Sequence, residues 1–532
     1  PGPTITMDPG GSHQVNLVNR LTDLSVQDII AFQPKVTGSN DPQAVKELIS
    51  KKSSITNVHA HGLHVSPQGR ADNVFLKLNS GKKNKYTYPL PSDHAPGTHW
   101  YHAHLHGSTA LQVQGGMSGA LIVKPPGQDL NPPNYSVTEK IIVLQTGATD
   151  SPLDPNLKTF TVNGKLKPLV QISSGSVQRF RIDNAGSRNG DYKNVWVSGH
   201  DMYLAAFDGV NLTSLPRNNP PLPGYVAYND KNPLILAPGN RADVYFIPGR
   251  TGTHSLMMKS ESGLEDLPSP ERRVQELMTI QVESPNSSFD SEFGNVMDGA
   301  QTGKFLFVLD NHLRQLQTTA PYNPNGRGYL RPIGKADLKR NVTFNVKPGR
   351  TMGRNYFING RDYNEMQNGG MAGSSDYLGR FAGDGGKGPQ GQSPWPIREG
   401  TVEQWTITNN STTKHSFHIH VNPFWVRDIV ERKDDKPENP LVNVRLTNPN
   451  DPRLNRWQDT VNLPPHKGYV VIQHRFTRFE GLFVVHCHIL NHQDRGMMIN
   501  IFIAPNQHQN PQAYFDLQRS TNKRINEEIQ DG

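Results

Sequence analysis

The fold of this chain is decided by the stretch Val485-His486-Cys487-His488-Ile489-Leu490-Asn491-His492-Gln493-Asp494-Arg495-Gly496-Met497. It holds the only cysteine in 532 residues, with a histidine on each side. A further histidine follows five positions after the cysteine, and a methionine ten positions after it. A thiolate, two imidazoles and a weak axial thioether form the ligand set of a blue-copper electron-transfer site. The stretch lacks one imidazole of that set, so we expect another histidine from elsewhere.

The histidines beside the cysteine indicate a second metal centre. In an extended strand, the neighbours of Cys487 point to the face opposite to its own side chain. His486 and His488 therefore cannot bind the same metal as Cys487. We predict that they bind metal at a centre that is joined to the first through the backbone of Cys487.

Composition favours a turn-rich β protein of about three domains. Glycine and proline number 48 and 42, and short apolar runs at 119–123, 140–144, 177–182 and 234–247 are separated by turn residues, which is typical of β-sandwiches. One cysteine excludes an intrachain disulfide framework. No apolar run approaches the roughly 18 residues of a membrane helix. The net charge of +8 comes without a nucleic-acid-binding module, so we interpret it as a solvated surface.

Three further histidine motifs supply candidate ligands. They are His59-Ala60-His61-Gly62, His102-Ala103-His104 and His415-Ser416-Phe417-His418-Ile419-His420. Together with the opening stretch they hold ten of the 21 histidines. Neutral imidazole suits copper, and His415 is the natural second imidazole for Cys487. The other eight histidines form four His-x-His pairs, which is enough for a multinuclear centre.

Internal repetition indicates three copies of one β unit. Gly97–His104 and Gly481–His488 align without a gap, with Ala103 in the place of Cys487. Between them, Gly252–Lys259 repeats the pattern with methionine and lysine at the two histidine positions. Because only the first and third copies carry ligands, we expect the second metal centre at their interface.

The repeats and turn signals predict a domain order. We expect domains at 1–130, 131–295 and 296–505, the middle one without copper, and an extended polar tail at 506–532. We also expect a strand from Gln14 to Leu21, a helix at 41–52 and a long loop at 361–394. Trp457–Val461 is interpreted as a structural strand.

At these motifs the chain resembles the three-domain multicopper oxidases, the laccase-like enzymes. The resemblance runs from Pro1 to about Pro505 and includes all four histidine motifs. It implies an all-β fold of three cupredoxin-like Greek-key β-sandwiches and four copper ions, one type 1, one type 2 and two type 3. It implies the type 1 ligands His415, Cys487, His492 and Met497, the type 2 ligands His59 and His418, and the type 3 ligands His61, His102, His104, His420, His486 and His488.

The resemblance also implies an activity. In the family, reducing substrates give single electrons to type 1 copper, and the electrons pass through the Cys–His segment to a trinuclear cluster that reduces O₂ to water. Asp72 matches the acid beside type 2 copper, so we expect it and Cys487 to be catalytic. Bacterial relatives often carry glutamate just after the last type 1 histidine. This chain has Gln493 there, and Asp494 or water would have to replace the acid.

Several alternatives stay open on the sequence. The leading hypothesis is a laccase-like oxidase of phenols or aromatic amines. A metallo-oxidase for Cu(I), Mn(II) or Fe(II) is the first rival, although residues 361–394 hold only two methionines, Met366 and Met371. A copper-free binding or scaffold protein on the same fold is the second. A two-domain nitrite reductase is disfavoured by the three repeats.

We expect accessory roles for the histidines beside the ligand motifs. His64, His99 and His106 are predicted to form hydrogen bonds around the metal sites rather than to bind metal themselves. The chain begins at Pro1 rather than methionine, which we interpret as a processed or truncated product. Since family members are mostly exported, we expect a periplasmic or extracellular protein.

Overall fold

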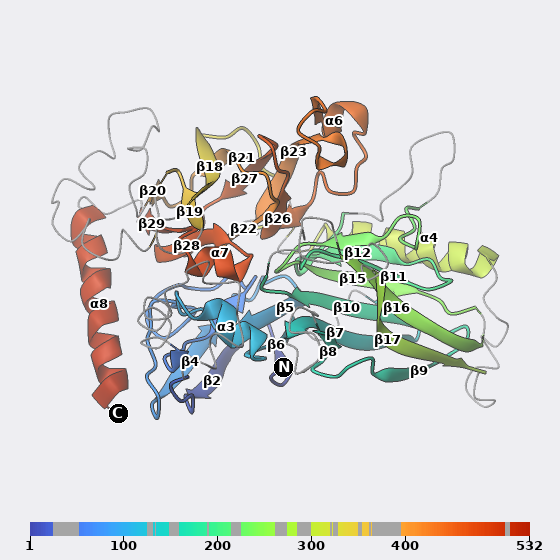
Figure 1. Cartoon of the computed structure of the whole chain (residues 1–532), viewed down its shortest axis with the longest axis horizontal. Helices are drawn as coiled ribbons and strands as arrows, with labels where there is room; N and C mark the ends of the chain where they lie inside the picture. Colours follow the sequence, from blue (N-terminus) through green and yellow to red (C-terminus); the bar gives the residue numbers. More distant parts are fainter. Residues whose placement is uncertain are drawn as a thin grey trace.

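A computed structural model of the whole chain provides the fold. It describes residues 1–24, 53–124, 131–132, 135–147, 159–188, 191–213, 225–249, 251–260, 274–284, 299–319, 322, 328–348, 354–360, 363, 395–505 and 511–531. Among these residues no helix is long and apolar enough to cross a membrane. The described strands form three units, each with two sheets (Figure 1).

The first unit contains the strands β1 to β6. They are β1 (Ile5–Met7), β2 (Ser12–Val18), β3 (His59–His61), β4 (Lys83–Pro89), β5 (Gly97–His102) and β6 (Ser118–Val123). One sheet has the order β1-β6-β5-β3, and the other pairs β2 with β4. The short helix α3 (Thr109–Gln114) follows β5. The strand predicted for Gln14–Leu21 runs from Ser12 to Val18, and after it the buried amide of Asn19 donates to the carbonyls of Ser54 and Leu78.

The middle unit contains the strands β7 to β17. They are β7 (Val137–Gly147), β8 (Thr159–Val162), β9 (Leu169–Ser173), β10 (Val177–Ala185), β11 (Lys193–Val197), β12 (Tyr203–Phe207), β13 (Val210–Asn211), β14 (Leu234–Leu236), β15 (Arg241–Phe246), β16 (Gly252–Ser260) and β17 (Val274–Glu283). The sheets have the orders β13-β12-β15-β10-β7-β8 and β14-β11-β16-β17-β9, and their apolar faces share one core. Helix α4 (Gly299–Leu316) packs on this unit through Phe305, Leu309 and Leu313.

The third unit contains the strands β18 to β29. They are β18 (Leu338–Pro348), β19 (Arg354–Ile358), β20 (Trp395–Arg398), β21 (Val402–Asn409), β22 (His415–Ile419), β23 (Phe424–Arg432), β24 (Leu441–Asn443), β25 (Trp457–Gln458), β26 (Thr460–Leu463), β27 (Tyr469–Arg475), β28 (Gly481–Cys487) and β29 (Met498–Ala504). One sheet has the order β19-β18-β21-β27-β23-β24, with β25 paired to β23, and the other has the order β20-β29-β28-β22-β26. Helices α6 (Val444–Thr447) and α7 (Leu490–Asp494) lie in its loops. Its core includes Cys487 and Met497.

The three sandwiches confirm the predicted all-β fold. Figure 1 shows the third unit lying across the first and the middle units. The predicted boundaries at 130 and 295 fall in segments outside the described residues and stay predictions. The helix predicted for 41–52 also lies outside them, as does the loop predicted for 361–394 except for Tyr363.

The extended tail predicted after residue 505 is wrong. Residues from Pro511 to Asp531 form the helix α8, which runs from the third unit along the first (Figure 1). Its buried residues Gln518, Ile525 and Ile529 recur at helical spacing, and the two isoleucines join the core of the first unit. Because only a few of the residues on this face are apolar, the composition of the segment concealed its periodicity.

Candidate metal centres

Two cross-strand pairs build a histidine cluster between the first and third units. In the first unit β3 runs antiparallel to β5, which places His59 opposite His102. In the third unit β22 runs antiparallel to β28, which places His418 opposite His486. Residues directly opposite each other on one face of a sheet have neighbouring side chains. The same arrangement in both units agrees with the repeat seen in the sequence.

The two halves of this cluster meet face to face. The ring of His59 stacks on that of His420 at 3.7 Å, and the ring of His61 stacks on that of His418 at 3.8 Å. The Nε2 atom of His104 lies 3.1 Å from Nε2 of His486. We call these eight residues the histidine cluster: His59, His61, His102, His104, His418, His420, His486 and His488. All eight are buried.

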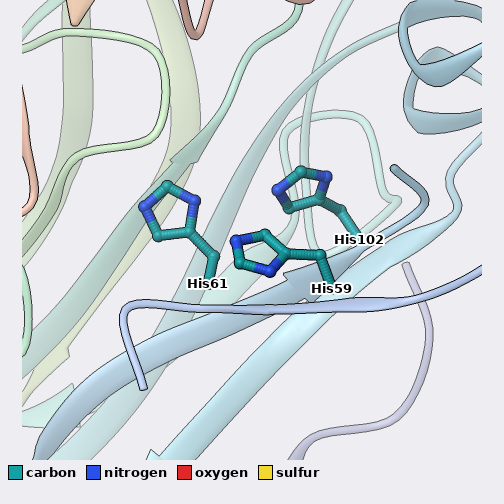
Figure 2. Close-up of side chains that lie close together, drawn as sticks. All are labelled: His59, His61 and His102. Atoms are coloured by element: carbon teal, nitrogen blue, oxygen red, sulfur yellow. The ribbon is translucent and has the colours of Figure 1, made fainter. Parts of the chain in front are cut away.

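Groups of three ligand atoms within 4.8 Å of one another recur through the cluster. His59, His61 and His102 form one of them, and Figure 2 shows their rings projecting to the same side from β3 and β5. Two further groups are His59 with His418 and His420, and His104 with His420 and His486. The ring of His488 lies 4.9 Å from that of His61. The third unit thus completes groups that begin in the first.

One nitrogen of several rings is anchored while the other has no partner. His59 Nδ1 lies 2.9 Å from Asp72 Oδ2, and His102 Nδ1 donates to its neighbour's carbonyl at 2.9 Å. His418 Nδ1 donates to the carbonyl of Asp459 at 2.9 Å. The opposite Nε2 atoms of these three rings are buried without a hydrogen-bond partner. Metal-binding histidines show this pattern, because the anchored nitrogen fixes the tautomer and frees the other for the metal.

Burial keeps at least four imidazoles of the cluster neutral. Burial, followed by the charges of His418 and Arg241, lowers the pKa of His102 to about 3, although the hydrogen bond to the Ala103 carbonyl opposes the shift. The pKa values of His59, His104 and His486 are also far below the ordinary value, first because of burial and then because of repulsion between the rings. A metal ligand must be deprotonated, so the cluster is prepared for binding at neutral pH.

Asp72 lies where the sequence predicted an acid. Its Oδ1 accepts a hydrogen bond from the backbone N–H of Ala60 at 2.8 Å, and its Oδ2 faces His59. Burial raises the pKa of Asp72 to about 8, although the Ala60 N–H favours the ionised form. Asp72 is therefore a buried group that can hold a proton beside a ligand histidine.

A second set of ligands lies in the core of the third unit. Cys487 Sγ is 3.6 Å from His415 Nδ1 and 3.7 Å from His492 Nδ1, and the two nitrogens are 3.1 Å apart. The N–H of Met497 donates to the carbonyl of His492 at 3.0 Å, and its own carbonyl accepts the N–H of Cys487 at 3.0 Å. The structure thus brings the side chains of Cys487, His415 and His492 together, and the backbone of Met497 is bonded to two of these residues.

The local environment supports metal binding by these four residues. Ser411 Oγ lies 2.8 Å from His415 Nε2, which leaves Nδ1 for the metal, and Tyr356 stacks on His492 at 4.0 Å. Burial lowers the pKa of His415 to about 3 and raises that of the Cys487 thiol to about 12. A coordinated metal deprotonates a thiol outright, so the thiolate form depends on the ion. The donor atoms of both sites fit copper.

The residues beside the ligand motifs have distinct positions. His64 Nδ1 donates to the carbonyl of Val421 at 2.8 Å, which joins the first and third units. His106 packs edge-on against Tyr363, next to His104 in a cavity of about 240 Å³. Both ring nitrogens of His99 are buried without a hydrogen-bond partner, so the predicted hydrogen-bonding role is not seen for that residue.

The residue after His492 is a glutamine instead of the glutamate that bacterial relatives often carry. Gln493 is fully buried, and its amide donates only to Thr109 Oγ1 at 3.3 Å. Both carboxylate oxygens of Asp494 accept backbone N–H groups, from Gly107 and Ala110, each at 2.8 Å. Asp494 therefore ties α7 to the start of α3.

Sequence reasoning missed Asp459, which was interpreted as part of a structural strand. Its Oδ1 lies 2.9 Å from His61 Nε2, and its two oxygens bind the Arg241 guanidinium at 2.8 and 2.6 Å. Burial alone would raise the pKa of Asp459, but Arg241 holds it well below the ordinary value. The only signal in the sequence is an acid just before a strand, which is too common to be diagnostic.

Comparison with known proteins agrees with the two sites. Residues 31–128 and 358–507 match two family models, both described as multicopper oxidase. A laccase of Bacillus stratosphericus is 22% identical over 94% of this chain and 88% of its own length. The iron transport multicopper oxidase FET3 of Kluyveromyces lactis is 22% identical over 86% of this chain and 69% of its own length.

A solved structure shows the same fold. The multicopper oxidase from Campylobacter jejuni, described as a metallo-oxidase, superposes with a TM-score of 0.58 at 20% identity, over 94% of this chain and 84% of its own. Both matched segments contain histidine motifs of the two sites, and the structure brings those motifs together. The chain belongs to the multicopper oxidase family, a family of copper-containing oxidoreductases that use O₂ as the electron acceptor.

Proposed function

We propose that this chain is a laccase-like enzyme that couples the one-electron oxidation of phenols or aromatic amines to the reduction of O₂ to water. The observation that carries the proposal is the direct backbone link between the two sites. Cys487 belongs to one ligand set, and both residues peptide-bonded to it, His486 and His488, belong to the histidine cluster. When bound, the coppers supply electron acceptance at the first site and four-electron reduction of O₂ at the second.

The proposed ligand assignment follows the motifs and uses every residue of the two sites. Type 1 copper takes His415, Cys487, His492 and Met497. Type 2 copper takes His59 and His418, and the type 3 pair takes His61, His102, His104, His420, His486 and His488. The support is the convergence of ring nitrogens in the structure, together with the anchoring of the opposite nitrogens.

The chain's own residues prepare both sites for this chemistry. The core of the third unit surrounds Cys487 and excludes water from its sulfur. Asp72 holds a proton beside His59 Nδ1, in a position to deliver it to the cluster. Gln493 does not replace the glutamate of bacterial relatives in the proposal, because an amide carries no acidic proton. Asp494 accepts the backbone N–H groups of Gly107 and Ala110 and joins α7 to α3.

Two variants test the proposed division of labour. Cys487→Ser should abolish the blue absorption near 600 nm that the family resemblance implies, yet keep copper in the histidine cluster. His102→Ala should keep the blue absorption but stop O₂ uptake. Absorption spectra, copper content and oxygen consumption are measured on the copper-loaded proteins. A colourless, fully loaded wild type, or unchanged turnover of His102→Ala, would contradict the assignment.

A metal-ion reductant is the second candidate. It is supported by the names of two similar proteins, the iron transport oxidase FET3 and the metallo-oxidase from Campylobacter jejuni. Comparing kcat/KM for a phenol with the values for Cu(I), Mn(II) and Fe(II) decides between the two. A value for one metal ion at least tenfold above that for the phenol would replace the laccase-like proposal by a metallo-oxidase.

We also propose that the protein is exported, as the resemblance implies, and that it is divided at residues 130, 295 and 505, as the sequence repeats and turn signals predict. The copper-free scaffold alternative loses support, because Cys487 and the histidines of both predicted ligand sets lie close together in the structure. Limited proteolysis that cuts only inside the three units would contradict the proposed boundaries.

A further inference from the structure

The middle unit contacts the histidine cluster although it carries none of its proposed ligands. A Cβ atom at Gly239 would lie only 2.9 Å from the ring of His488, so this turn rests directly on a cluster residue. The carbonyl of the preceding Pro238 accepts a hydrogen bond from Ser416 Oγ at 2.9 Å. The turn between β14 and β15 therefore forms one wall of the cluster.

Arg241, the first residue of β15, joins all three units. Its side chain is fully buried. The guanidinium binds both carboxylate oxygens of Asp459 in the third unit, at 2.8 and 2.6 Å. Its Nε donates to the carbonyl of Thr98 in the first unit at 3.3 Å, and its Nη1 donates to the carbonyl of Gly239 at 3.0 Å. A paired, forked contact of this kind fixes the orientation of the carboxylate.

Asp459 forms hydrogen bonds with two histidines of the cluster and so fixes their orientation. Its Oδ1 lies 2.9 Å from His61 Nε2, and its backbone carbonyl accepts from His418 Nδ1 at 2.9 Å. A carboxylate ion-paired with arginine can only accept, so the proton of His61 is held on Nε2. The lone pair of His61 is then on Nδ1, which is buried without a partner. His418 presents its unpartnered Nε2 in the same way.

The backbone of Asp459 is held by the middle unit as well. Asp208 Oδ2 accepts the N–H groups of Asp459 and Thr460 at 3.2 and 3.1 Å. The amide of Asn240 donates to the carbonyl of Thr460 at 2.9 Å. Because Asp208 also accepts the N–H of Arg241, at 3.0 Å, the arginine and its partner segment are bound to one common carboxylate.

The glycine of the His-x-His-Gly motif makes room for this arginine. Gly62 has a φ of +89°, a conformation that other residues rarely adopt. A Cβ atom at Gly62 would also overlap Arg241 Nη2 and would lie 2.8 Å from Asp459 Oδ2. The backbone of the first unit thus leaves space for an ion pair that the other two units supply.

We propose that Arg241 of the copper-free middle unit is a positioning residue of the trinuclear site. It holds the Asp459 carboxylate, which binds His61, and with it the segment whose backbone carbonyl binds His418, so that both rings turn their unprotonated nitrogens toward the metals. The inference rests on the proposed function, since it takes the histidine cluster as the copper site. It gives the middle unit a role in metal binding although that unit provides no ligand.

A purely structural role for the same ion pair makes a different prediction. A buried pair can often be replaced by apolar residues of similar volume with little loss of stability, whereas removal of one partner leaves an uncompensated charge. If Arg241 and Asp459 only stabilise the interface, the double variant Arg241→Met/Asp459→Leu should recover both folding and copper binding. If they position the histidines, it should recover folding alone.

The test compares Arg241→Met, the double variant and the isosteric Asp459→Asn in the full-length, copper-loaded protein. The readouts are copper per chain during titration with a chelator, absorption near 600 nm and the free energy of unfolding. We expect all three to keep the blue absorption and to release the cluster copper at roughly 10–100-fold lower chelator concentration than wild type. If the other two variants do not fold, copper release from Asp459→Asn alone tests the proposal.

Arg179→Met is the matched control. Arg179 is also a buried arginine of the middle unit, but its guanidinium pairs with Asp243 and Glu139 instead of Asp459. It should lose stability without altering copper release. Wild-type copper retention by the double variant or by Asp459→Asn would overturn the proposal for Arg241. Failure of the proposed function is distinguishable, because the wild type itself would then hold no cluster copper.

Discussion

At the scale of single residues, Asp72 is the acid on which the proposed proton delivery depends. It lies 2.9 Å from His59 Nδ1 and is shielded from solvent. Asp72→Asn keeps the shape and the hydrogen bond to the ring but removes the acidic proton. We expect slower reoxidation of the reduced enzyme by O₂, by about 10²–10⁴-fold if the acid acts in general acid–base catalysis. Reduction by substrate should be unchanged.

Stopped-flow absorption at the blue band measures the two half-reactions of Asp72→Asn separately. Because Gln493 supplies no acid, the chain has no replacement at the position used by bacterial relatives. Equal rates of reoxidation for wild type and variant would remove Asp72 from the proton path.

The proposed ligands could be predicted from the sequence, but the residues that we propose to orient them could not. Three of the ten motif histidines lie in one stretch with the only cysteine, and the other seven stand in three further His-x-His motifs, a combination that is typical of metal binding. Arg241 and Asp459 are 218 positions apart and lie in different units. Each looks like an ordinary residue at the edge of a strand, so only the packing of the three units shows that they form a pair.

At the scale of elements, Asp494 fastens helix α7 to helix α3 across two units. Burial raises the pKa of Asp494 to about 6, above its ordinary value of 3.8. The folded chain therefore binds the Asp494 proton more tightly than the unfolded chain does. The stabilisation that this proton gives to the folded state is complete below pH 3.8 and is lost as the pH rises through 6. The free energy of unfolding should fall with pH in this window.

Asp494→Asn should flatten that part of the pH profile, because the amide does not titrate. Chemical denaturation between pH 3.5 and pH 7 measures it. The exposed Asp516→Asn on α8 is the control and should keep the wild-type slope. A wild-type slope in Asp494→Asn would show that this carboxyl does not govern the pH dependence.

Helix α8 couples the end of the chain to the first unit. Asn526 accepts the N–H of Lys77 at 2.7 Å, and Arg70 pairs with Glu528. These contacts hold the segment that carries Asp72. The helix was not foreseen, because only two of its three buried residues are apolar, and the buried face is recognisable only against the surface it covers.

Ile529→Ala should lower the free energy of unfolding by about 2–5 kcal/mol, since it leaves a cavity in the core of the first unit. Leu517→Ala, in an exposed position of the same helix, should change it by less than about 0.5 kcal/mol. Urea titration monitored by circular dichroism provides both values. Equal effects of the two substitutions would mean that α8 does not pack in solution as described.

At the scale of the whole molecule, the three units contribute different kinds of residue to the two sites. The third unit supplies one complete ligand set and half of the histidine cluster, and the first unit supplies the other half. The middle unit supplies Arg241, Asp208 and the turn at Gly239. The sequence repeats predicted the shared interface, whereas the contribution of the middle unit appeared only in the assembled fold.

The most direct test of this account is anomalous scattering at the copper absorption edge from crystals of the copper-loaded protein. We predict four peaks. One should lie among Cys487, His415 and His492, and three should lie inside the histidine cluster between the first and third units. Strong peaks elsewhere, or a single peak at Cys487 with none in the cluster, would contradict the account.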